Sequence, residues 1–484
     1  MTSLTRAQKI ATVILFAIIV FFCLFRLTES PPFTFDEGWA VQIASNIAHA
    51  GIDGTQFTPS TMEHVPIVAI GYPLLYPLAL WFKLFGAGVM QARLFMMLYM
   101  LGLAVVSFVF VRKTFGNREA LAALAILATF PPLYAFGKPV FGEIPVLFWL
   151  MTMLLCFRYA LSATRHRRLL LVLAGASAGL CVATKPMALV LLPVLVVGAV
   201  IVLRRRQASW KELAIVTVSA LVPIIAWILV NFHDAGSLAH IADFYSNPSA
   251  LTNKAAAFWA SATFLVTTPG SLFGLGLLAM WLVGVIVRCA KKIAVPMEEW
   301  MALLFALIVL ASFMTHYADA RYLVPLQILS ILFMPHSLSV ILSALPKLRT
   351  NERARGYIFG TVIGLLTVGG LYQLSAKSYV AESYGSTLTH DMQAYFAAVP
   401  TTTKVLFYNA TNAIPFFAGR DFYQRMVVFE KWQFGSDYAP LVKAHIPDML
   451  VINSLSKADQ QVSLTGYTQT AQLGKMVIYT RMTK

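Results

Sequence analysis

The stretch Phe33-Thr34-Phe35-Asp36-Glu37-Gly38-Trp39 follows directly after the first long apolar run of the chain. It places two adjacent carboxylates at the point where that run would leave a membrane, in a sequence that has few charges elsewhere. Carboxylates in such a position are candidates for acid–base chemistry on lipid-bound substrates. Whether a membrane surface exists there depends on the rest of the sequence.

The composition is that of a polytopic membrane protein. Of the 484 residues 58% are hydrophobic and 12% are charged, and the mean hydropathy is +0.72, whereas about one quarter of a soluble domain is charged. The net charge of +16 does not indicate nucleic-acid binding, because the basic residues form short clusters between apolar runs. Neither a nucleotide-binding loop nor a zinc-protease motif occurs in the sequence.

The predicted fold class is an all-α polytopic membrane protein with a small α/β domain at its C-terminal end. A bilayer core of about 30 Å requires about 20 apolar residues per helix. Residues 9–27 lack a small-residue cleavage site and are predicted to be an uncleaved signal anchor. This criterion predicts eleven spans, at 9–27, 89–111, 119–137, 143–161, 168–184, 186–203, 211–231, 258–288, 298–315, 321–345 and 356–375.

The distribution of Lys and Arg predicts the orientation. The basic clusters occupy alternate loops, so with eleven spans they all lie on one side, which the positive-inside rule assigns to the cytoplasm. We therefore expect a multi-pass protein of the bacterial inner (plasma) membrane with a cytoplasmic N-terminus. Residues 1–380 then form the membrane module, and residues 381–484 form a periplasmic domain.

Two long segments lie on the periplasmic side in this topology. In the first, residues 28–88, apolar spacing over Trp39–His49 predicts an amphipathic helix along the interface that ends at Gly51. A second surface helix is predicted over Tyr72–Phe85, and Pro269-Gly270 indicates that the first part of 258–288 is a re-entrant or surface piece. In the tail, short apolar runs at 404–408, 426–429, 449–452 and 476–479 alternate with polar or helical stretches such as 392–399, which predicts the α/β domain.

Asp36 and Glu37 have two compatible interpretations. Asp is favoured as a helix N-cap, and acidic residues in a first turn complement the helix dipole. Alternatively, Asp36 is a general base that takes a proton from an acceptor hydroxyl, with Glu37 beside it as a second catalytic candidate. A cap residue with a free second oxygen can still act as a base.

Isolated cations near the outer ends of the spans are the next candidates. Several share one predicted membrane depth, which favours a phosphate site over mere snorkelling of each side chain to the lipid headgroups. Arg would offer a bidentate fork and Lys a point charge. The candidates for binding a donor phosphate are Arg93, Lys138, Lys185 and Arg321.

Candidates for orienting the acceptor are Glu143, Tyr322 and His64. Glu143 alternatively forms an ordinary ion pair with one of the cations. The spacing of His64, His316 and Asp319 matches no metal motif, so we expect no metal site and no cofactor.

The order of several short motifs resembles the GT-C glycosyltransferases of the protein O-mannosyltransferase and aminoarabinose transferase group. The resemblance extends from about residue 9 to 430 and includes the outward loop with Asp36-Glu37. The further motifs are Gly71-Tyr-Pro73-Leu-Leu-Tyr76, Phe85-Gly86, Ala92-Arg93-Leu94, Gly175-x-x-x-Gly179-Leu-x-x-x-Thr184-Lys185-Pro186, Tyr317-Ala-Asp-Ala-Arg321-Tyr322-Leu-Val-Pro325 and Ile414-Pro-Phe-Phe-Ala-Gly419-Arg420.

The resemblance implies a sugar donor carried on polyprenyl phosphate and an inverting, metal-independent transfer on the periplasmic side. Asp36 would be the general base, and Arg93, Lys185 and Arg321 would be candidates to hold the donor phosphate. At Lys138 and Glu143 the sequence departs from the Arg and Asp that are more usual in the group. The implied acceptor is lipid A or its core, another envelope glycan, or a protein; a glycolipid or polysaccharide is favoured because the short tail resembles bacterial lipid- and glycan-modifying members.

Two other classes of protein remain as alternatives. A flippase or transporter of an anionic lipid-linked glycan would carry charges deep in several spans and often an internal repeat. Here the charges gather at the ends of the predicted spans and no repeat is found, which favours an enzyme. A membrane scaffold whose soluble tail carries the function would leave the placement of these charges unexplained.

Overall fold

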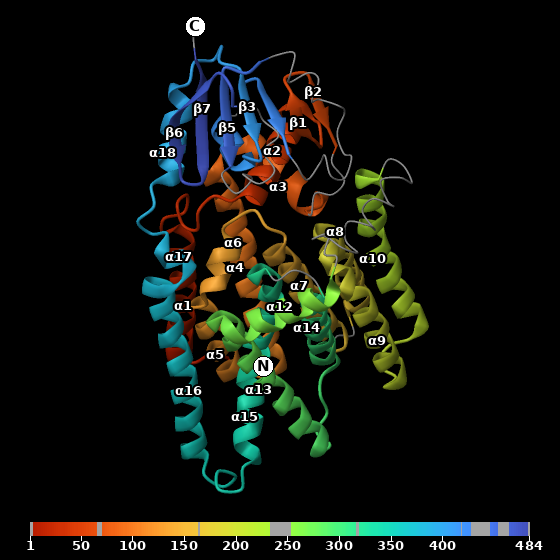
Figure 1. The fold of residues 1–484 in the computed structure, drawn as a ribbon. Coiled ribbons are helices and arrows are strands. Elements are labelled where there is room, and N and C mark those ends of the chain that lie inside the picture. Colours follow the sequence, from red (N-terminus) through yellow and green to blue (C-terminus); the bar gives the residue numbers. More distant parts are fainter. Residues whose placement is uncertain are drawn as a thin grey trace.

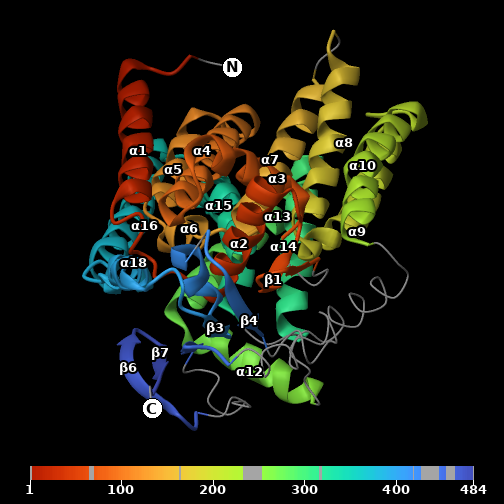
Figure 2. The ribbon, with the colours of Figure 1, turned by 90° about the horizontal axis from the view of Figure 1, so that it is seen from above.

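The computed structural model describes residues 3–64, 70–162, 165–232, 253–315, 319–417, 419–426, 446–453 and 464–482. His316 and Tyr317, which the sequence analysis singled out, lie outside these ranges. Long helices form a bundle, and a small β-sheet stands at one end of it (Figure 1). The helices of the first long loop lie between the bundle and the sheet (Figures 1 and 2).

The number of predicted spans agrees with the described part of the chain. It contains ten helices that are long and apolar enough to cross a membrane, or eleven if the bent pair α5–α6 is counted as one span. The bounds of the bundle helices are α1 Arg6–Leu24, α4 Val89–Thr114, α5 Asn117–Ala128, α6 Pro131–Gly137, α7 Glu143–Ala160, α8 Arg167–Thr184, η1 Pro186–Val190, α9 Leu191–Arg204, α10 Trp210–Asn231, α12 Lys254–Thr267, α13 Pro269–Ala290, α14 Met297–Thr315, η2 Ala320–Leu323, α15 Val324–Ala344, α16 Glu352–Tyr372, η3 Gln373–Lys377 and α17 Tyr379–Glu382.

The eighth span differs from its predicted bounds. The apolar run 258–288 is divided at Thr268 into α12 and α13, and Pro269 is the first residue of α13. Proline disfavours helical backbone in the residue before it and suits the first turn of a new helix. The spanning helix is therefore 269–290, and α12 is a separate helix that packs against α13 and α14.

The first long loop contains α2 (Phe35–Ala50), the hairpin β1 (Thr55–Thr58) and β2 (Thr61–Glu63), and α3 (Tyr72–Phe85). The bounds of α3 are those predicted, and Gly51 ends α2 in a left-handed conformation. Much of α2 is buried against other parts of the protein, and its position along the membrane interface stays a prediction. One core joins α2, α3 and the start of α4 to the C-terminal sheet.

The C-terminal domain is a five-stranded sheet with the strand order β4-β3-β5-β7-β6. β3 lies parallel to both β4 and β5, and the remaining pairs are antiparallel. Its elements are α18 Leu388–Ala398, β3 Val405–Tyr408, η4 Thr411–Phe417, β4 Phe422–Arg425, β5 Met449–Asn453, β6 Tyr467–Leu473 and β7 Met476–Arg481.

The predicted apolar runs at 404–408, 449–452 and 476–479 correspond to β3, β5 and β7, and the helical stretch 392–399 falls on α18. Of the run predicted at 426–429, only Met426 lies within the described residues, and β4 ends one residue before it. Strand β6 was not predicted, because its sequence Tyr-Thr-Gln-Thr-Ala-Gln-Leu is polar and its side chains are mostly exposed at the edge of the sheet.

Candidate active site

The first turn of α2 presents one carboxylate to solvent and buries the other. Thr34 is the N-cap, and its hydroxyl accepts a hydrogen bond from the backbone N–H of Glu37 at 3.3 Å. The helix therefore begins two residues earlier than an Asp36 cap would require, and Asp36 lies inside the first turn. The Asp36 side chain is 41% exposed, whereas that of Glu37 is fully buried.

Glu37 is committed to a buried ion pair with Arg93 from α4. The Arg93 Nε and Nη2 atoms donate to the two Glu37 carboxylate oxygens at 2.8 and 2.7 Å. Arg93 Nη1 donates to the backbone carbonyls of Leu27 and Pro31, each at 2.9 Å. Because both side chains are inaccessible to solvent, this geometry leaves neither available to a substrate, although the sequence suggested catalysis for one and phosphate binding for the other.

Arg321 contacts Asp36 directly, across 285 positions of sequence. Its position is set by the 3-10 turn η2, where the Asp319 side chain caps the turn by accepting from the Arg321 backbone N–H at 3.0 Å. The guanidinium forms ion pairs with Asp36 and, from Nε at 3.2 Å, with Asp319. It also donates to the Tyr322 hydroxyl at 3.1 Å.

Lys185 pairs with Glu143 close to Arg321. Lys185 adopts an extended backbone before Pro186 and so ends α8, and its side chain lies against Gly142. A Cβ on Gly142 would be 2.8 Å from the Lys185 Cδ, so only glycine at position 142 leaves room for the Lys185 side chain in this conformation. The Lys185 ammonium donates to Glu143 Oε1 and lies 5.5 Å from the centre of the Tyr322 ring.

The two carboxylate oxygens of Glu143 differ in their hydrogen bonding among the described residues. Its side chain is fully buried, and its second oxygen, Oε2, has no hydrogen-bond partner among the described residues. Asp36 and Asp319 form ion pairs with Arg321, and Glu143 forms one with Lys185. The cluster therefore has three carboxylates, from Asp36, Glu143 and Asp319, and two cations.

Lys138 lies in a different environment. Its ammonium donates to the carbonyls of Phe25 and Ser30 at 2.8 and 3.0 Å, and the residue is 1% exposed. Burial, and then the positive charge of Arg93, lower the pKa of Lys138 to about 7. Lys138 thus fastens the segment before α2 and does not line the cavity described below.

His64 joins the hairpin β1–β2 to the end of α10. Its ring nitrogens lie 3.0 Å from the Asp53 carbonyl oxygen and 3.2 Å from the Asn231 carbonyl oxygen. It does not line the cavity. Within the described ranges, no group of three or more His, Cys, Asp and Glu side chains is placed to hold a metal ion.

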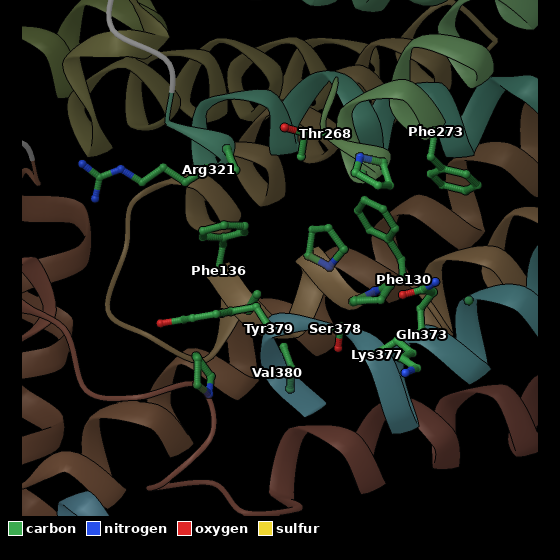
Figure 3. A pocket seen from close by; sticks show the side chains of 18 of the residues that line it. Phe130, Phe136, Thr268, Phe273, Arg321, Gln373, Lys377, Ser378, Tyr379 and Val380 are labelled. Atoms are coloured by element: carbon green, nitrogen blue, oxygen red, sulfur yellow. The ribbon is translucent and has the colours of Figure 1, made fainter. Parts of the chain in front are cut away.

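A cavity of about 1220 Å³ opens beside the Asp36–Arg321 pair. Asp36, Asp319 and Arg321 form one polar end, and the body is apolar, with Phe130, Phe136, Phe141, Phe273, Leu365 and Leu366 among its lining residues. Figure 3 shows Arg321 at one end, Gln373 and Lys377 at the other, and the rings of Phe130 and Phe136 between them.

The sequence analysis missed the contribution of the last span and of Asp319 as an ion-pair partner. The polar residues Gln373 and Lys377 belong to η3, a π-helical turn at the end of α16. Single π-helical turns are frequent at functional sites, but a primary sequence does not reveal them. For Asp319 a signal existed, since Asp directly before a helical turn is a typical capping residue.

The fold and part of the sequence match known glycosyltransferases. Residues 72–229 match the family model described as dolichyl-phosphate-mannose-protein mannosyltransferase. The crystal structure of ArnT from Cupriavidus metallidurans in the apo state is similar over 98% of both chains, with a TM-score of 0.66 and 16% identity. No curated protein sequence matches the chain.

Two further structures share the fold. ArnT from Cupriavidus metallidurans bound to undecaprenyl phosphate matches with a TM-score of 0.61 and 16% identity, over 99% of this chain and 98% of that chain. The archaeal oligosaccharyltransferase AglB from Archaeoglobus fulgidus, in complex with an inhibitory peptide and a dolichol-phosphate, matches with a TM-score of 0.61 and 14% identity, over 93% and 70%. The structural matches show that the chain shares the fold of these proteins, and the family match over residues 72–229 agrees with the resemblance seen in the sequence.

Proposed function

We propose that this protein transfers a sugar from a polyprenyl-phosphate carrier to an acceptor hydroxyl, with inversion at the anomeric carbon. The observation that carries the proposal is the meeting of Asp36 and Arg321 at the polar end of a large apolar cavity. A partly exposed carboxylate beside a cation suits a base near a phosphate, and the aromatic and aliphatic lining suits a prenyl chain. The similar fold of an ArnT structure bound to undecaprenyl phosphate supports this assignment.

In the proposed reaction, the acceptor oxygen attacks the anomeric carbon and transfers its proton to Asp36. The bond from the anomeric carbon to the phosphate oxygen breaks, and the polyprenyl phosphate leaves with the electron pair. Arg321, assisted by Lys185, stabilises the charge that develops on the leaving phosphate. All the proposed chemistry is performed by side chains, without a metal or cofactor.

Arg321 and Asp36 have to separate during this reaction. An inverting displacement places the base and the leaving group on opposite faces of the sugar ring, whereas these two side chains are in contact in the structure. Donor binding therefore replaces the Asp36 carboxylate by the phosphate as the partner of Arg321. The released carboxylate is then free to bind the acceptor hydroxyl.

The proposed location is the bacterial inner membrane, with the N-terminus in the cytoplasm and the C-terminal sheet domain on the periplasmic side. The placement of Lys and Arg clusters in alternate loops supports this orientation. The acceptor would be lipid A or its core, another envelope glycan, or a protein Ser or Thr. A reporter enzyme fused after Lys484 tests the orientation, because activity on the cytoplasmic side would contradict it.

The experiment is mass spectrometry of envelope lipids and glycans from a deletion strain complemented with wild type or variants. We expect a sugar increment to vanish on deletion and to return with wild type and with Asp391→Asn, which changes an exposed carboxylate of α18. Asp36→Asn should not restore the increment. Restoration by Asp36→Asn would instead favour a transporter or scaffold, which does not need this carboxylate as a base.

A binding assay with the purified protein tests the phosphate site. Arg321→Ala should weaken binding of a polyprenyl-phosphate sugar by about tenfold to a hundredfold, since a hydrogen bond to a charged group contributes about 1.5–3 kcal/mol. Asp391→Asn again serves as the control. An unchanged dissociation constant in Arg321→Ala would show that the phosphate binds elsewhere.

A further inference from the structure

The first turn of α2 is held on two sides. On the side of the bundle, Glu37 is fixed by Arg93. On the other side lies η4 of the C-terminal domain, so close to α2 that a Cβ on Gly38 would be 2.4 Å from the Thr411 carbonyl oxygen. Backbone approaches backbone there, and Asp36 is the accessible carboxylate of this turn.

A side-chain hydrogen bond from Thr411 joins η4 to this turn. The Thr411 hydroxyl donates to the backbone carbonyl of Phe35 at 2.5 Å, and the residue is fully buried. Phe35 is the first residue of α2 and directly precedes Asp36. A hydrogen bond at this carbonyl therefore acts on the peptide unit that joins Phe35 to Asp36.

The position of Thr411 is itself rigidly determined. It is the first residue of η4, which follows β3 after two residues. β3 lies inside the sheet and pairs with β4 on one side and β5 on the other. Phe33 adds an edge-to-face contact with Phe416 of η4, with ring centres 5.8 Å apart.

We propose that Thr411 is a positioning residue for Asp36, through which the C-terminal sheet domain forms part of the catalytic site. The proposal rests on the assignment of Asp36 as the base. The C-terminal domain would then contribute to the chemical step, and not only to stability or acceptor recognition. A displacement of a catalytic group by about 1 Å costs about a hundredfold in rate, so a single buried hydrogen bond at this turn matters.

The test compares Thr411→Val, Thr411→Ser and Gln424→Leu in the full-length protein. Val keeps the shape of Thr but cannot donate, and Ser keeps the donor. Gln424→Leu is the matched control, because it removes another buried hydrogen bond between the sheet and α2, from Gln42 Nε2 to Gln424 Oε1 at 3.0 Å, well beyond the first turn. The readouts are kcat, the KM for the lipid-linked donor, and hydrogen exchange of the peptide covering 33–40.

We expect Thr411→Val to lower kcat by about tenfold to a hundredfold with an unchanged donor KM. Exchange in 33–40 should become faster, and Thr411→Ser should restore both values. Gln424→Leu should leave kcat within about twofold of wild type, although it destabilises the domain contact. Thr411→Ala provides the same comparison if Thr411→Val does not fold.

Equal losses of kcat in Thr411→Val and Gln424→Leu would overturn the proposal, because they would reflect general weakening of the domain contact. An unchanged kcat with faster exchange would overturn it as well. Asp36→Asn in the same assay separates this failure from that of the proposed function. If Asp36→Asn retains turnover, the base assignment fails, whereas the exchange data still decide whether Thr411 holds the turn.

Discussion

Replacing Glu37 by Gln should destabilise the protein far more than the same change at an exposed ion pair. Gln fills the same space but removes the negative charge, and its amide offers only one oxygen to the Arg93 fork. Arg93 would then remain charged and buried, with only the Leu27 and Pro31 carbonyls as fully retained partners. The neighbouring Asp36→Asn removes a charge from a pair that is partly exposed.

The size of the expected loss of stability follows from the burial of the ion pair. Both side chains of the Glu37–Arg93 pair are fully buried, and removing one partner of a buried pair costs about 3–5 kcal/mol. The Arg167–Glu212 pair has similar chemistry, but its side chains are 27% and 21% exposed. We therefore expect Glu212→Gln to cost about 1 kcal/mol or less, and Asp36→Asn to lie in the same range.

The assay is unfolding in detergent micelles together with transfer by the same preparations. Because membrane proteins often unfold irreversibly, inactivation half-lives at one temperature are compared among wild type, Glu37→Gln, Glu212→Gln and Asp36→Asn. Glu37→Gln should inactivate fastest. Asp36→Asn should keep nearly the wild-type half-life and lose transfer.

The refuting result is a Glu37→Gln protein as stable as Glu212→Gln that has nevertheless lost turnover. Glu37 would then act chemically, as the sequence alone suggested, and the buried pair would have to open during catalysis. A Glu37→Gln protein with normal stability and normal turnover would show that the anchor on α2 is dispensable.

Two further predictions concern glycines. Gly142→Ala should weaken donor binding by about tenfold, because the added Cβ would lie 2.8–3.3 Å from three carbons of Lys185 and would turn its ammonium away from Glu143. Gly360→Ala is the control, because its Cβ meets no atom within 4 Å. Equal donor affinities in the two variants would show that Lys185 does not contact the donor. Gly369→Phe should lower the affinity for a long-chain donor by at least about tenfold and leave a short-chain analogue unaffected, since Gly369 lines the cavity and its Cβ points into open space. Gly364→Phe on the same helix, outside the cavity lining, is its control; equal effects on both chain lengths would mean that the chain binds elsewhere.

Much of the fold can be predicted from the sequence, because hydropathy and helix-terminating residues are local properties. The apolar runs give the spans, Pro269 marks the start of a helix, and α3 has its predicted bounds. Hydropathy does not predict the edge strand β6, because this polar strand is stabilised by pairing with β7 and not by burial of its own side chains.

The candidate site is less predictable, because the partner of each charge is decided by tertiary contacts. Sequence reasoning grouped Arg93 with Arg321 as cations at one membrane depth, yet one is buried against Glu37 and the other faces the cavity. Adjacent residues Asp36 and Glu37 likewise point to different surroundings. A helix turns by about 100° per residue, so neighbours in sequence face different elements, and only the packing of α2 shows which of them is accessible.

The ion pairs at the site have a consequence for which phosphates can bind. Arg321 and Lys185 have carboxylate counterions, so an arriving phosphate exchanges one anion for another and gains little from charge alone. Inorganic phosphate or a water-soluble sugar nucleotide has nothing further to offer. A lipid-linked phosphate is already held in the membrane beside the protein, and its chain adds packing contacts with the apolar lining of the cavity. On the proposed function, the protein would thus discriminate against the abundant soluble phosphates, because Arg321 and Lys185 are already paired with carboxylates.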